Sequence, residues 1–93
     1  MSDDTPRFIV SDKCIAFSQT LLTNRRTVHT DQDAVGTGNT LFDWFDSNGA
    51  LTAERAPIAA RCIELGITLL KNSTSTTADI VEQVKSAYMH YAR

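Results

Sequence analysis

Apolar and polar residues alternate with a helical period most clearly between Ala53 and Asn72. Two adjacent apolar rows run along this stretch and cover well over half of a helix surface. The first row contains Ala56, Ala60, Ile63, Ile67 and Leu70, and the second contains Ile58, Cys62, Leu65 and Leu69. A helix with so little polar surface must be covered from several sides, so we predict that residues 53–72 form the central helix of a small bundle.

The N-terminal part of the chain carries a second helical pattern. Val10, Cys14, Phe17 and Leu21 are spaced by four, three and four residues, with Ile15 and Leu22 beside them. Thr5-Pro6 is typical of a helix start, so we predict a helix over about residues 6–24 after a frayed tail at 1–5. Because Phe8–Val10 and Cys14–Phe17 are rich in strand-forming residues, an N-terminal β-hairpin is the alternative.

The C-terminal part of the chain carries a third pattern, a single apolar stripe. Its residues are Ile80, Val84, Ala87 and Tyr91, flanked by Val81 and Tyr88. Thr76, followed three residues later by Asp79, is a favourable helix start. We therefore predict a helix over about residues 77–92 that packs antiparallel on the central helix after a short connection.

The middle of the chain is less regular. Residues 27–39 (TVHTDQDAVGTGN) mix Thr, Asp, Asn and Gly without a period, so we predict a long loop there. Thr40 and Asp43 fit a variant capping box that begins a short helix carrying three aromatic residues, Phe42, Trp44 and Phe45. Gly49 is free to adopt a positive φ and end this helix.

Together these patterns predict an all-α fold, a compact bundle of about four helices, one of them short, with the α+β form as the alternative. The chain has 93 residues, of which 42% are hydrophobic and 22% charged, as expected for a single soluble globular domain over residues 1–93.

Its acidic start is followed by no long apolar run, so we expect a cytoplasmic protein without a signal peptide or transmembrane segment. Cys14 and Cys62 are 48 residues apart without zinc-site spacing, so we expect buried free thiols.

Charge is distributed unevenly along the chain. The formal net charge is −2, and residues 1–49 hold seven acidic and four basic side chains, whereas residues 50–93 hold four acidic and five basic ones. There is no basic block of the kind that binds phosphate groups, so binding to nucleic acid or to an anionic membrane is not expected. An acidic N-terminal half instead favours a protein partner with a basic surface.

Residues 41–55 (LFDWFDSNGALTAER) resemble the calcium loop of the EF-hand family. The third, fifth and sixth positions of that loop are matched by Asp46, Asn48 and Gly49. Trp44 and Arg55 occupy the first and twelfth positions, where the family uses carboxylates. The resemblance therefore implies a helix-loop-helix shape, and we expect no calcium binding in the physiological range.

Function is predicted by elimination, because we find no motif for catalysis, a cofactor or a metal. The preferred interpretation is a small non-enzymatic protein-binding module, of the kind that phages and mobile elements encode to inhibit a host protein or defence complex. The alternatives are a degenerate EF-hand-like domain and a weak DNA-binding regulator, and the composition also allows a homo-oligomer. An aromatic residue flanked by carboxylates is typical of an interface. The predicted partner-binding residues are Asp43, Trp44 and Asp46, with Asp31 and Asp33 as a rim.

Overall fold

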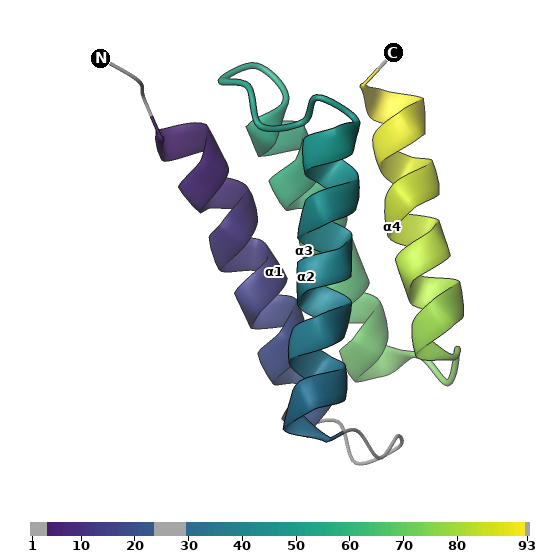
Figure 1. The fold of residues 1–93 in the computed structure, drawn as a ribbon. Helices are drawn as coiled ribbons and strands as arrows, with labels where there is room; N and C mark the ends of the chain where they lie inside the picture. The colour runs from purple at the N-terminus through teal and green to yellow at the C-terminus, as the bar shows by residue number, and fades with distance from the viewer. Residues whose placement is uncertain (1–3, 24–29, 93) are drawn as a thin grey trace.

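The computed structural model describes residues 4–23 and 30–92, which form a bundle of four helices (Figure 1). The helices are α1 (Thr5–Thr23), α2 (Asp31–Ser47), α3 (Ala56–Asn72) and α4 (Thr77–Tyr91). Neither described range contains a strand. The predicted all-α bundle is therefore confirmed, and the alternative with an N-terminal hairpin is wrong.

Helix α1 agrees with the predicted N-terminal helix. It begins at Thr5, so this residue belongs to the helix rather than to a frayed tail, while residues 1–3 and 24 lie outside the described residues. Its buried side is formed by Pro6, Val10, Cys14, Phe17, Ser18 and Leu21. These residues include the whole row spaced by four, three and four that predicted the helix.

Helix α2 corrects the prediction for the middle of the chain. The predicted loop over 27–39 is wrong for residues 31–39, which are helical, and residues 27–29 lie outside the described part. The N-cap is Thr30, whose Oγ1 accepts a hydrogen bond from the Asp33 backbone N–H at 3.1 Å. Thr40, the predicted cap, is exposed in the interior of this helix. The aromatic segment is thus the last part of a 17-residue helix rather than a short helix of its own.

Helices α3 and α4 follow the predicted positions with small changes. The central helix begins at Ala56 instead of residue 53, after a turn in which Thr52 Oγ1 accepts from the Arg55 backbone N–H at 3.2 Å. Thr76 caps α4 as predicted, with its Oγ1 accepting from the Asp79 N–H at 3.2 Å. Gly49 has a φ of 71°, as predicted for the end of α2, and no other described residue has a positive φ.

Helix α3 is central because it packs against both α1 and α4. Gly66 makes this close packing possible. A Cβ atom at this position would lie 2.5 Å from Val84 Cγ2 and 3.1 Å from Phe17 Cε2, so a larger residue has no room. Ile63 and Ile67, which belong to the first apolar row predicted for this helix, are 0% and 7% exposed.

Helix α2 packs mainly on α1, and its C-terminal end reaches α4 through aromatic rings. The ring of Phe45 lies edge-on to those of Trp44 and Tyr88, with centroid distances of 5.1 and 5.2 Å. Phe45 and Tyr88 are buried in the same apolar cluster as the residues of α1 and α3. The four helices therefore share one continuous core, while the outer side of α1 and α2 is covered by no other described element (Figure 1).

Candidate functional site

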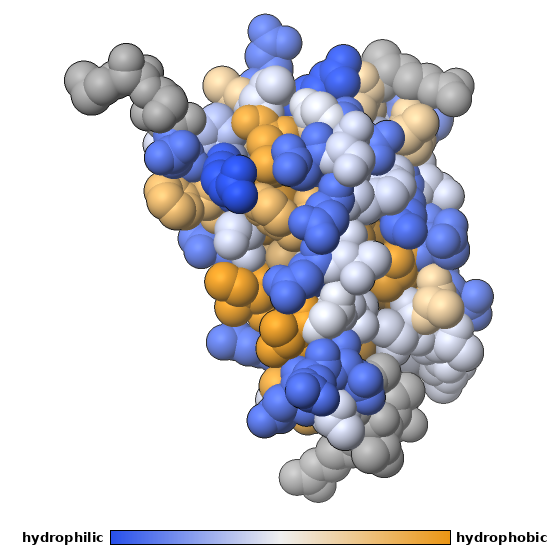
Figure 2. Space-filling view, in the orientation of Figure 1, coloured by the Kyte–Doolittle hydropathy of each residue, from blue (hydrophilic) through white to orange (hydrophobic). Residues whose placement is uncertain are grey.

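The outer side of α1 and α2 carries an unusual number of exposed apolar side chains. Phe8, Ile15 and Leu22 on α1 are 61%, 53% and 42% exposed, and Val35 on α2 is 52% exposed. Phe42 on α2 is half-buried beside them. Figure 2 shows hydrophobic residues gathered over α1 and along the seam between α1 and α2. We call these five residues the α1–α2 face.

The α1 part of this face follows from the sequence spacing. Phe8, Ile15 and Leu22 are seven residues apart, which is close to two helical turns, so they form one row along the helix. The buried residues of α1 lie on its other side. The sequence interpretation placed Ile15 and Leu22 beside the core row but did not recognise a second, outward row. The signal was available, because a helix on the edge of a bundle needs only one apolar stripe for its core side.

A groove of about 460 Å³ runs between α1 and α2 on this side. Its walls include Ile15 and Leu22 from α1 and Val35 and Phe42 from α2. The guanidinium group of Arg7 makes a cation–π contact with Phe42, with Cζ 5.3 Å from the ring centroid.

The bottom of this groove holds the two helices close together. Ser18 is buried and its Oγ donates a hydrogen bond to the Ala34 carbonyl oxygen at 2.8 Å. A Cβ atom at Gly38 would overlap Ser18 Oγ and lie 3.1 Å from the Cys14 carbonyl oxygen. The groove is thus set on a tightly packed pair of helices, which gives it a fixed shape.

The two cysteines are buried free thiols, as predicted. Burial raises the pKa of the Cys14 thiol to about 12, because a thiolate would lose its hydration there. Burial raises the pKa of Cys62 as well. Since only the thiolate is a good nucleophile or metal ligand, neither side chain is suited to such chemistry at neutral pH.

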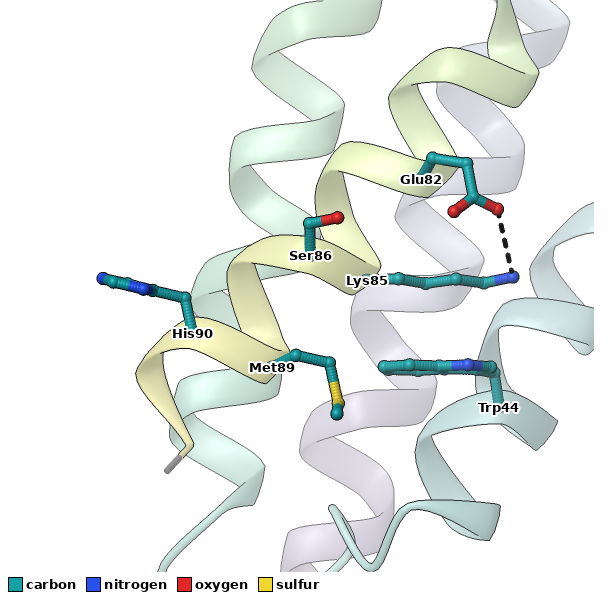
Figure 3. Close-up of a pocket in the computed structure, with 6 residues that line it drawn as sticks. All are labelled: Trp44, Glu82, Lys85, Ser86, Met89 and His90. Carbon is teal, nitrogen blue, oxygen red and sulfur yellow. Dashed lines mark ion pairs between the residues drawn. The ribbon is translucent and has the colours of Figure 1, made fainter.

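Trp44, the predicted aromatic anchor, is half-buried and faces α4 rather than the α1–α2 face. Its ring lies edge-on to that of Tyr88 with a centroid distance of 5.7 Å. Figure 3 shows the Lys85 side chain extended above the indole ring, and the Lys85 Nζ lies 5.8 Å from the ring centroid and 3.8 Å from Glu82 Oε1. Much of the indole is therefore already occupied by contacts within the molecule.

The structure separates the predicted acidic residues into two groups. Asp31 precedes Val35 by four residues and Asp46 follows Phe42 by four, so both carboxylates lie one helical turn from the α1–α2 face. Asp43 is exposed one turn after Asn39, which lines the groove. Asp33 lies on the other side of α2, where it lines a pocket with Thr37 of the same helix and Val81 of α4.

The segment that resembles an EF-hand loop joins α2 to α3, which is the helix-loop-helix order that the resemblance implies. Asp46 lies in the last turn of α2, and the Asn48 side-chain amide donates a hydrogen bond to the Trp44 carbonyl oxygen at 2.7 Å. Within residues 4–23 and 30–92, no group of three His, Cys, Asp or Glu side chains could hold a metal ion.

A second apolar groove lies on another side of the bundle, between α3 and α4. It is lined by Ile58, Arg61, Cys62, Leu65, Ala87 and Tyr91, with a volume of about 510 Å³. Leu65 and Tyr91 are 46% and 67% exposed. This groove carries fewer exposed aliphatic residues than the α1–α2 face. None of the four described helices is long and apolar enough to cross a membrane.

Comparisons of the chain with models of protein families, with curated proteins and with solved structures gave no significant match.

Proposed function

We propose that this chain is a small protein-binding module that acts by occupying a surface of a larger protein partner. One observation carries the proposal, namely the α1–α2 face, where three apolar side chains that are 42–53% exposed, Ile15, Leu22 and Val35, border a groove together with Phe42. Contiguous apolar surface of this kind is costly to leave in water and typically marks a protein interaction site. Occupying a partner's surface blocks other contacts there, so inhibition is the mode of action that we propose with it.

The placement of Trp44 changes which residues we expect to bind. Since its indole is already packed on Tyr88 and Lys85, we assign the apolar contact to Ile15 and Val35. Asp31, Asp43 and Asp46 remain in the proposed site as an acidic rim of the α1–α2 face.

Affinity purification of the tagged chain from the cells that produce it tests this proposal. We expect one protein to be captured by the parent chain but not by Ile15→Ser or Val35→Ser, because each substitution removes an exposed apolar contact without opening the core. Leu65→Ser is the matched control on α3, in the other groove, and should capture the same protein. Circular dichroism must show that all four proteins are folded.

Two results would count against the proposal. Capture of the same protein by all four chains would place the binding site elsewhere. If none of the chains captured any protein, the protein-binding function itself would be overturned.

A further inference from the structure

We propose that the occupant of the α1–α2 face is an amphipathic helix with basic flanks, supplied by a partner protein. This inference rests on the proposed binding function and adds the shape and charge of the partner segment. The register of α1 and α2, the order of the apolar side chains along their seam and the carboxylates beside that seam support it.

The register of α1 and α2 is fixed by two close approaches. Ser18 bonds to the carbonyl of Ala34, and Cys14 lies against Gly38. Four residues backward along α1 thus correspond to four residues forward along α2, as expected for two antiparallel helices (Figure 1). This correspondence gives the level of every other residue along the seam.

The apolar residues of the face alternate between the two helices at these levels. Their order along the seam is Phe8, Phe42, Ile15, Val35 and Leu22. The resulting stripe extends over fourteen residue steps of α1, or about 21 Å at 1.5 Å per residue. A partner helix of about four turns would cover it.

A helix suits this stripe better than an extended segment does. A third helix packs well into the seam between two antiparallel helices, with apolar residues at positions i, i+3 or i+4, and i+7. An extended segment gains its binding energy mainly by adding to the edge of a sheet, and the described residues form no strand. The occupant is therefore expected to place one apolar row along the groove.

Carboxylates surround the stripe. Asp4 precedes Phe8 by four residues and Asp12 follows it by four, and the exposed Asp31, Asp43 and Asp46 form the rim on α2. The ion pairs of the described chain, Lys13–Glu64 and Lys85–Glu82, do not involve them, and Arg7 is the one described cation that lines the groove. Lysine or arginine residues flanking the apolar row of a partner helix would supply the missing positive charge.

The same charges argue against other occupants. A second copy of this chain would bring one acidic rim against another, and such like-charge contacts disfavour binding. Anionic lipid surfaces and nucleic acids are disfavoured for the same reason. The charge of the face thus selects a basic protein segment.

The probe is a displayed library of 18-residue helical peptides in which the charged and apolar positions are randomised. Selection on the parent chain should enrich peptides with a net positive charge and apolar residues at i, i+3 or i+4, and i+7. Ile15→Ser and Val35→Ser should bind an enriched peptide roughly tenfold more weakly or worse, whereas Leu65→Ser should bind it like the parent.

A charge-neutral variant tests the acidic rim separately. The triple variant Asp31→Asn, Asp43→Asn, Asp46→Asn should associate more slowly with the enriched peptide and lose most of the salt dependence of the association rate. Asp33→Asn is the matched control, because it removes a carboxylate from the same helix on the side that faces α4. This control should retain the association rate and salt dependence of the parent.

Enrichment of neutral, acidic or proline-rich peptides would overturn this inference, as would no enrichment at all. Sedimentation equilibrium showing a dimer that Ile15→Ser dissociates would also overturn it, in favour of a second copy. These outcomes are separate from the failure of the proposed function, because a captured partner that depends on Ile15 would still establish protein binding.

Discussion

Two glycines of α2, Gly36 and Gly38, lie two residues apart in very different surroundings. A Cβ atom at Gly36 would meet nothing within 4 Å, whereas one at Gly38 would overlap Ser18 Oγ. We expect Gly36→Ala to stabilise the protein by about 0.5–1 kcal/mol through helix propensity. Gly38→Ala should destabilise it by about 1–3 kcal/mol through overpacking. Urea denaturation measures both, and equal effects would contradict the close packing of α1 on α2.

Cys14 predicts a dependence of stability on alkaline pH. Its pKa is about 12 in the folded protein and 9.0 in its ordinary state. Between these values the unfolded chain loses its thiol proton while the folded protein keeps it. The free energy of unfolding should therefore fall as pH rises above about 9, by up to about 1.4 kcal/mol per pH unit from this group. Cys14→Ala should show a shallower decline than the parent in urea denaturation at pH 8 to 10.5, and an identical decline would contradict the burial of this thiol.

At the scale of elements, the start of α2 gives a matched pair of substitutions. Thr30→Ala removes the acceptor of the Asp33 N–H and should cost about 1 kcal/mol. Thr40→Ala replaces an exposed residue inside the helix and should be neutral or slightly stabilising, since alanine has the higher helix propensity. Thermal denaturation followed by circular dichroism compares the two. The reverse order would support a helix that begins at Thr40.

The same pair shows why the sequence predicted three helices well and α2 only in part. A threonine followed three residues later by aspartate occurs at Thr30, Thr40 and Thr76, and the pattern alone does not say which one is a cap. The row Ala34, Gly38, Leu41 and Phe45 has helical spacing, but alanine and glycine contribute little hydrophobicity to it. Glycine is also a poor helix former. Gly38 is needed because α1 packs closely against α2 at this position. This is a tertiary contact, so the local sequence pattern does not predict it.

The candidate site was predictable to a similar extent. The acidity of the N-terminal half is a property of the sequence, and three of the predicted carboxylates, Asp31, Asp43 and Asp46, do lie around one surface. Trp44 packs against Tyr88, which is more than forty residues away in the sequence. The contacts of Trp44 could therefore not be predicted from the neighbouring sequence. The outward row on α1 could have been found from its spacing of seven residues, as a second apolar stripe on one helix.

At the scale of the whole molecule, the helices differ in what they contribute: α3 forms the centre of the core, whereas α1 and α2 also carry the exposed apolar residues. Helix α3 lies between α1 and α4, and its buried residues join the two sides of the core. Helices α1 and α2 bury one side against this core and leave apolar residues on the other. Substitutions on the α1–α2 face should therefore change binding while leaving the fold intact, whereas substitutions in α3 should change stability.

Ile63 in α3 provides the clearest test of this division. Its side chain is fully buried in the core cluster that contains Val84, so Ile63→Ala leaves a cavity and should cost about 2–5 kcal/mol. That is a large part of the roughly 5–15 kcal/mol that stabilises a typical domain, so the melting temperature should fall clearly. Leu65→Ala, two residues later, is the control. Leu65 is 46% exposed, so its truncation should cost about 1 kcal/mol or less. An unchanged melting temperature for Ile63→Ala would show that α3 is not the centre of the core.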